Sequence, residues 1–157
     1  MIEPEVPGWG SPRIAHLVLD VNGTLSLDGD LLPGVPERVA ALRRLVEVHL
    51  VSADTWGRLD DISAALGVVG VRVRRGEPES PQKAAYVRDL GPTSVVAIGN
   101  GANDEGMLRE AALGIVVLGP EGLAASALDA AELVVGSIDD ALDLLLNPRR
   151  LTATLRR

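Results

Sequence analysis

The chain has 157 residues, of which 46% are hydrophobic, and this length is sufficient for one domain with a single core. Phenylalanine is absent and aromatic residues make up only 2% of the chain, so we expect no base-stacking surface for single-stranded nucleic acid. The net charge of −7 also argues against a polyanion partner, and the lack of cysteine excludes disulfides and thiolate metal sites.

Residues 1–13 have no basic end followed by an apolar stretch, so we expect no signal peptide. Their prolines and glycines predict an irregular or hairpin lead-in. No apolar run in the chain approaches the roughly 18 residues that span a bilayer. We therefore expect a cytoplasmic protein that binds neither membranes nor nucleic acids.

Short apolar runs alternate along the chain with segments of helical period. Strands are predicted at residues 14–20, 47–52, 68–73, 94–98, 115–118 and 133–135, with a turn-rich connection at 25–34. Helices are predicted from near Pro36, around 59–66, at 80–90 with Ser80 as N-cap, at about 104–112, near 123–128, and from 138 to Pro148. This alternation predicts an α/β fold with a doubly wound, Rossmann-like parallel sheet.

We expect one domain over residues 1–157, because no internal repeat, low-complexity segment or linker interrupts the pattern. Its core covers about 14–146. Residues 147–157 form a basic tail that we expect to dock onto the fold or onto a partner subunit. His16 and His49 lie within predicted strands, where we expect structural roles.

The first predicted strand ends in a carboxylate, Asp20, and the polar turn Asn22-Gly23-Thr24 follows at once. The carboxyl ends of parallel strands lie at the sheet edge where α/β proteins bind ligands. A strand that merely stops in an aspartate-containing turn is the alternative. Whether the other strand ends also carry polar side chains therefore decides between a ligand-binding site at Asp20 and a turn without function.

Three further strand-to-helix junctions carry polar side chains: Ser52, then Lys83, then Asn100 with Asn103 and Asp104. Because parallel strands share one carboxyl edge, these groups can converge. Their types suit phosphoryl transfer, in which a carboxylate attacks phosphorus, hydroxyl and N–H groups hold phosphate oxygens, and an acidic cluster holds Mg²⁺. Lys83 is the only lysine among 15 basic residues, and its compact ammonium fits beside a phosphoryl oxygen better than a guanidinium; a solvated surface lysine is the alternative.

These motifs resemble those of the haloacid dehalogenase (HAD) superfamily of aspartate-nucleophile phosphotransferases. The first motif of that superfamily, Asp-x-Asp-x-Thr after a strand, here reads Asp20-Val21-Asn22-Gly23-Thr24. Ser52 matches the second motif and Lys83 the third, and the fourth is matched by Gly99-Asn100-Gly101-Ala102-Asn103-Asp104. The resemblance covers about residues 14–146, implies a HAD-type fold, and is nearest to the small group labelled soluble P-type ATPase.

The resemblance implies a role for each matched residue. Asp20 is the nucleophile, acting with Ser52 and Lys83. Phosphate is expected to contact Gly23, Thr24, Ser52, Ala53 and Lys83. The Mg²⁺ set is expected to be Asp20, the backbone carbonyl of Asn22, the Asn100 side chain, and Asp104, which ties Lys83 or a metal-bound water in place. Asn103 is expected to lie behind these ligands and to hold them in place without contacting the ion.

Two positions depart from the superfamily pattern, since Asn22 and Asn100 stand where aspartate is usual. The residue at position 22 normally acts as a general acid and base, which contributes about 10²–10⁴ in rate, and asparagine does neither. We therefore expect slow turnover of phosphorylated Asp20. The lost negative charge at Asn100 predicts weaker Mg²⁺ binding.

The spacing of the motifs leaves no room for a cap domain, because only 27 residues separate Thr24 from Ser52 and 30 separate Ser52 from Lys83. An uncapped site accepts a large substrate or borrows a lid from a neighbouring subunit, so we expect a homo-oligomer. We predict a Mg²⁺-dependent phosphohydrolase acting on a small phosphorylated substrate or a phosphorylated macromolecule. The alternative is a phospho-acceptor or phosphate-binding regulatory module with little turnover. A dinucleotide-binding protein is disfavoured, since Gly99-Asn100-Gly101 lacks a third glycine at the required spacing.

Overall fold

The computed structural model describes all 157 residues and contains one six-stranded, fully parallel sheet. In chain order its strands are β1 His16–Leu19, β4 Glu47–Ser52, β5 Val69–Arg72, β6 Val95–Gly99, β7 Leu113–Val117 and β8 Leu133–Val135. Their order across the sheet is β5-β4-β1-β6-β7-β8. The predicted doubly wound α/β fold is confirmed, and no cap domain is present between the motifs.

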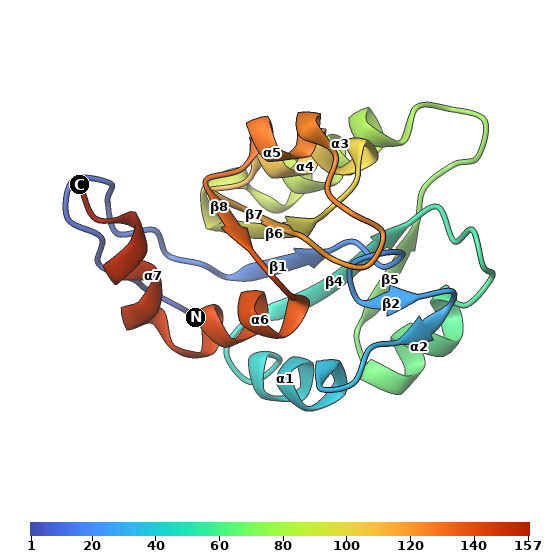
Figure 1. Cartoon of the computed structure of the whole chain (residues 1–157), viewed down its shortest axis with the longest axis horizontal. Helices are drawn as coiled ribbons and strands as arrows, with labels where there is room; N and C mark the ends of the chain where they lie inside the picture. The colour runs from blue at the N-terminus through green and yellow to red at the C-terminus, as the bar shows by residue number, and fades with distance from the viewer.

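Helices cover both faces of the sheet, as Figure 1 shows. One face carries α1 Val35–Leu42, α2 Leu59–Leu66 and α6 Ile138–Leu146; the other carries α3 Glu79–Leu90, α4 Glu105–Glu110 and α5 Ala125–Ala130. Successive strand residues point to opposite faces, so Leu17 and Leu19 join the core under the first group while Val18 joins the core under the second. Burial on both faces explains why β6 and β7 consist only of apolar residues and glycine.

The strand order reverses direction at β1. From β1 the chain moves outward through β4 and β5, and then returns to the other side of β1 to add β6, β7 and β8. In open α/β sheets, ligands bind in the crevice that opens at such a reversal, at the carboxyl ends of the strands. Asp20 follows β1 directly and Asn100 follows β6, so both lie at this crevice.

Three segments differ from the sequence prediction. The turn-rich connection contains a two-stranded hairpin, β2 Ser26–Leu27 and β3 Asp30–Leu31. The basic tail, for which no helix was predicted, forms helix α7 Pro148–Leu155, which starts at the proline because proline has no N–H to lose in a first turn. Leu151 of this helix is buried in the main core. Ser80 is not an N-cap, since α3 begins at Glu79 and the Ser80 hydroxyl accepts the N–H of Gly106 at 2.9 Å.

The remaining elements are two short 3₁₀ turns, η1 Pro92–Ser94 and η2 Ala102–Asp104, which precede β6 and α4. The lead-in forms isolated bridges, Ile2 with Ile14 and Val6 with Gly10. Figure 1 shows that the lead-in and α7 lie side by side at one end of the molecule, where the Arg157 N–H donates to the Pro7 carbonyl at 3.0 Å. None of the helices combines the length and the apolar character needed to cross a bilayer.

Candidate active site

A buried ion triad lies at the carboxyl ends of β1 and β6. The Lys83 ammonium donates to Oδ1 of Asp20 and to Oδ1 of Asp104, each at 2.7 Å. Lys83 and Asp104 have no exposed surface and Asp20 is 4% exposed. Helix α3 brings Lys83 to this edge from the face that also carries α4. The first, third and fourth motifs therefore meet as one cation, Lys83, between two carboxylates, Asp20 and Asp104.

Asp104 is held away from the cleft by its own hydrogen bonds. Its Oδ2 accepts the backbone N–H of Asn100 at 3.0 Å and of Gly101 at 2.9 Å, while its Oδ1 accepts Lys83. A β-carbon at Gly99 would lie 2.5 Å from the Asp104 carboxylate, so glycine is required for this close approach. The structure thus places Asp104 where it positions Lys83 and the Asn100 loop.

The Thr24 hydroxyl joins the first and fourth motifs. Its Oγ1 lies 3.1 Å from Oδ2 of Asp20 and 3.1 Å from Oδ1 of Asn100, and Thr24 is buried. The other end of the Asn100 amide donates to the Gly122 carbonyl at 3.1 Å. This bond orients the Asn100 side chain so that its oxygen, not its nitrogen, faces Asp20.

The donor set at this point is made of oxygen atoms. The carboxylate of Asp20 and the amide oxygen of Asn100 meet at one hydroxyl, and Asn22 lines the same cleft. Mg²⁺ prefers oxygen ligands and is usually bound by one or two carboxylates, with water completing its shell. The residues present therefore fit a magnesium ion, with a single carboxylate as the direct anionic donor.

A cleft of about 190 Å³ opens beside these groups. It is lined by Asp20, Asn22, Ser52, Ala53, Thr55, Glu79, Asn100, Gly101, Asn103 and Glu121. Ser52 Oγ accepts the Asp54 N–H at 2.9 Å and lies 3.5 Å from Nδ2 of Asn22. The backbone N–H groups of Asn22 and Ala53 donate to no other group of the protein. A hydroxyl and two free N–H groups at one cleft are suited to an anion such as phosphate.

Gly23 contributes to the cleft through its backbone conformation. Its φ of +79° is a left-handed value that favours glycine, and its N–H donates to the Ser26 carbonyl at 2.8 Å. A β-carbon at this position would clash with the Glu121 carboxylate and lie 3.0 Å from Nδ2 of Asn100. Glycine therefore leaves space for an acidic side chain directly above the first motif.

Burial shapes the charge state of the triad. Desolvation, with the nearby Asp104 carboxylate, raises the pKa of Asp20 to about 6, although Lys83 and Thr24 oppose the shift. Burial by itself would lower the pKa of Lys83, but Asp20 and Asp104 hold it above its ordinary value. The lysine thus stays charged, and the raised pKa of Asp20 makes the ionisation of this carboxyl sensitive to pH in the mildly acidic range.

Two acidic residues of the cleft were missed by the sequence analysis. Glu121 comes from the turn after β7, a strand end that was not counted among the polar junctions. Its signal in the sequence is the Gly-Pro-Glu-Gly turn that follows an apolar strand. Glu79 opens α3 and accepts Nδ2 of Asn103 at 2.6 Å, which places Asn103 at the cleft rim.

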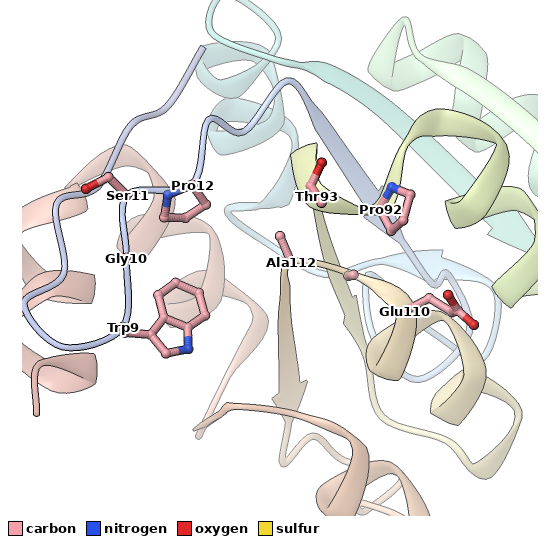
Figure 2. Close-up of a pocket in the computed structure, with 9 residues that line it drawn as sticks. Trp9, Gly10, Ser11, Pro12, Pro92, Thr93, Glu110 and Ala112 are labelled. Carbon is pink, nitrogen blue, oxygen red and sulfur yellow. The ribbon is translucent and has the colours of Figure 1, made fainter.

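A larger hollow lies elsewhere and has no comparable chemistry. Its volume is about 640 Å³, and Figure 2 shows Trp9 and Pro12 of the lead-in on one side and Pro92, Thr93 and Glu110 on the other. Glu110 is its only ionisable lining residue, and that carboxylate accepts Arg88 at 2.7 Å. The motif residues do not line this hollow, so the smaller cleft is the candidate site.

No protein-family profile matches the chain. It is 53% identical to the uncharacterized protein MJ0073 of Methanocaldococcus jannaschii over 62 residues, which are 40% of this chain and 67% of that protein. This chain belongs to the family of MJ0073. It is also 29% identical to a copper-transporting ATPase of Oryza sativa subsp. japonica over 126 residues, which are 78% of the MJ0073-family chain and 12% of the transporter.

Solved structures show which fold the MJ0073-family chain adopts. A 3-deoxy-D-manno-octulosonate 8-phosphate phosphatase from Moraxella catarrhalis, in complex with magnesium, phosphate and the KDO molecule, superimposes with a TM-score of 0.70 at 18% identity, covering 90% of each chain. The cobalt-bound deoxy-D-mannose-octulosonate 8-phosphate phosphatase from Haemophilus influenzae superimposes with a TM-score of 0.71 at 15% identity, covering 92% of this chain and 94% of that one. A protein assigned as a HAD-family hydrolase from Streptomyces avermitilis gives 0.69 at 19% identity over 87% of each chain. The HAD fold predicted from the motifs is confirmed.

Proposed function

We propose that this protein is a phosphohydrolase that uses Mg²⁺ and accepts the phosphoryl group of a small phosphorylated substrate on Asp20. The observation that carries the proposal is the buried triad, in which Lys83 lies 2.7 Å from both Asp20 and Asp104. The solved neighbours support it, because two of them are phosphatases named for a sugar-acid phosphate and were crystallised with magnesium or cobalt. A phosphorylated macromolecule is the second substrate class, since the site carries no cap.

The proposed reaction has two steps. A carboxylate oxygen of Asp20 attacks phosphorus, the bond between phosphorus and the leaving oxygen breaks, and the leaving oxygen takes a proton from water. A water molecule then attacks the phosphorus of the aspartyl-phosphate, releases inorganic phosphate and restores the carboxylate. Ser52 and the N–H groups of Asn22 and Ala53 bind the phosphoryl oxygens, while Lys83 offsets their charge.

Asp20, the Asn100 side chain and the Asn22 carbonyl would hold Mg²⁺, with Asn103 supporting the site from the rim. When bound, the ion offsets negative charge on the transferring phosphoryl group. Gly23 and Thr24 act by shaping the turn and by aligning Asp20 with Asn100. Asp104 acts through Lys83, which it holds in place.

Asn22 supports slow turnover within this proposal. Its amide lies at the cleft, 3.5 Å from Ser52. An amide can neither give a proton to a leaving group nor take one from water. The same observation favours a second candidate function, a phospho-acceptor module in which Asp20 is phosphorylated and then hydrolysed very slowly. The two functions share the first chemical step and differ in the rate of the second.

The experiment is phosphate release from a panel of small phosphoesters with Mg²⁺, comparing wild type with Asp20→Asn. We expect the variant to lose about 10³-fold or more of the rate, because the nucleophile is removed while an amide of the same size takes its place. Equal rates would refute the hydrolase. Acetyl-phosphate labelling provides the second measurement: a stable label on Asp20 without phosphate release would support the acceptor module instead.

Self-association is part of the proposal. Exposed apolar side chains support it: Val134 in edge strand β8 is 52% exposed, and Leu118 just after β7 and Leu128 in α5 are also exposed. A neighbouring subunit that covered this edge would also bring surface close to the end of β7 and to Glu121. A monomer mass from light scattering at micromolar concentration would contradict self-association and leave the proposed phosphohydrolase activity untouched.

A further inference from the structure

The chain has only two histidines, and the fold brings them into contact. His16 opens β1 and His49 lies in the adjacent strand β4, 33 residues further along the chain. Nδ1 of His16 is 3.2 Å from Nε2 of His49. Oε2 of Glu47, the first residue of β4, is 3.5 Å from that His16 nitrogen and 4.0 Å from that His49 nitrogen. Three potential ligand atoms therefore lie within 4.0 Å of one another.

Strand geometry explains this arrangement. Glu47 and His49 are two residues apart in one strand and so point to the same face of the sheet. The parallel register pairs His16 with Glu47, which puts all three side chains on the face that α3 covers. Backbone pairing with a fixed register, rather than flexible loops, thus sets the positions from which the three side chains project.

The distances match those of a metal site. In a tetrahedral zinc centre with bonds of about 2.0–2.1 Å, neighbouring ligand atoms lie about 3.3 Å apart. The three separations of 3.2, 3.5 and 4.0 Å are close to this edge length, and the two longer ones involve the flexible Glu47 carboxylate. Small rotations of one exposed side chain would complete the set without moving the backbone.

Tyr86 orients the buried histidine from above. Its hydroxyl on α3 lies 2.9 Å from Nδ1 of His49, and the two rings are edge to face. When Nδ1 donates to this hydroxyl, Nε2 presents its lone pair to His16 and Glu47. Metal-binding histidines characteristically hold their second nitrogen in such a bond.

We propose that His16, His49 and Glu47 form a binding site for a divalent transition metal of the zinc type. Two imidazoles and one carboxylate favour zinc over magnesium, whereas the oxygen-only set at Asp20 favours magnesium. His49 is 3% exposed, but His16 is 21% and Glu47 is 59% exposed, so an ion can enter from the Glu47 side and keep one water ligand. The site is separate from the cleft, because His49 and Ser52 are three residues, about 10 Å, apart along β4.

The test uses tag-free protein that carries Asp20→Asn, which weakens metal binding at the cleft. Titration with Co²⁺ is expected to give one equivalent of intense visible absorption, characteristic of a four-coordinate ion, which Zn²⁺ then displaces. We expect His16→Gln to abolish this absorption and Glu47→Gln to weaken Co²⁺ binding at least tenfold. Glu3→Gln, which removes the same charge from the exposed lead-in, serves as the matched control and is expected to bind Co²⁺ like its parent.

Nuclear magnetic resonance provides a measurement that needs no variant. Because the chain has only two histidines, both sets of ring signals are expected to shift with Zn²⁺ and to stay unchanged with Mg²⁺. Absorption of the weak six-coordinate type, binding that survives His16→Gln, or ring signals unmoved by Zn²⁺ would overturn the proposal. Those results would leave the two histidines as a hydrogen-bonded pair.

Discussion

The Lys83 ammonium lies 2.7 Å from Oδ1 of Asp20, and Lys83 has no exposed surface. Removing one partner of a buried ion pair leaves an uncompensated charge, which costs about 3–5 kcal/mol. We therefore expect Lys83→Met to lower the free energy of unfolding by roughly this amount, measured with urea at pH 7, and to abolish phosphate release. Arg13→Met, at an exposed ion pair, is the control and should change stability little. Wild-type stability in Lys83→Met would show that the triad is not ionised as described.

Asn22 is the position at which a single substitution should increase activity. Aspartate there can protonate the leaving oxygen and activate water, so Asn22→Asp is expected to raise the steady-state rate of phosphate release by about 10²–10⁴. Asn103→Asp introduces the same change at the cleft rim, where the amide is bonded to Glu79, and should give no such increase. If the Asn22→Asp rate matched wild type, proton transfer would not limit turnover.

Glu121 places a second carboxylate beside the predicted magnesium ligands, against Gly23 and near the Asn100 amide. Its charge offsets the one lost at Asn100, so Glu121→Gln is expected to weaken Mg²⁺ binding about tenfold. The readout is the rise in melting temperature as a function of the Mg²⁺ concentration c; the stabilisation behind it grows as RT ln(1 + c/Kd) and so reports Kd without depending on turnover. Glu3→Gln controls for net charge, and an unchanged Mg²⁺ requirement in Glu121→Gln would exclude a role for this carboxylate.

The raised pKa of Asp20 predicts a pH-dependent nucleophile. With a pKa of about 6, caused by burial and by Asp104, Asp20 is largely protonated below this pH and cannot attack phosphorus. A cation bound to the carboxylate lowers the pKa, so the rate of Asp20 phosphorylation should fall with an inflection at or below pH 6. Acetyl-phosphate labelling between pH 4.5 and 8 measures it. An inflection well above pH 6 would assign the titration to another group.

Arg38 and Asp143 connect α1 to α6 through two hydrogen bonds, Nε to Oδ1 at 2.8 Å and Nη2 to Oδ2 at 3.2 Å. The bonded guanidinium lowers the pKa of Asp143. A depressed carboxyl pKa stabilises the fold above the unfolded-state value of about 3.9 and loses that contribution as the pH falls through the folded-state value. Urea unfolding at pH 3 and pH 7 should therefore show a smaller difference in Asp143→Asn than in wild type. Equal differences would mean that the pair adds no stability.

The sequence by itself determined the elements of the fold and the principal residues of the candidate site. Apolar runs and helical period depend on local burial, so the six strands and the helices between them could be predicted to within a few residues. Strand ends are local features as well, and for that reason Asp20, Ser52 and Asn100 could be named before their distances were known. Lys83 could be named because it is the only lysine and lies near the start of a predicted helix. The hairpin at 26–31 was missed because two-residue strands leave almost no periodic signal. The helix after Pro148 was missed because the proline was interpreted only as the end of the preceding helix, although proline is also favoured in the first turn of a new one.

Only the tertiary structure decided which distant residues meet. The pairing of β1 with β4 brings His16 to His49, and no periodicity within either strand encodes that neighbourhood. The turn after β7 brings Glu121 over Gly23 because β7 lies next to β6 in the sheet. Strand order and register determine such contacts, and both depend on how the whole apolar core packs. Contacts between side chains that come from separate strands can therefore be identified only from the assembled sheet.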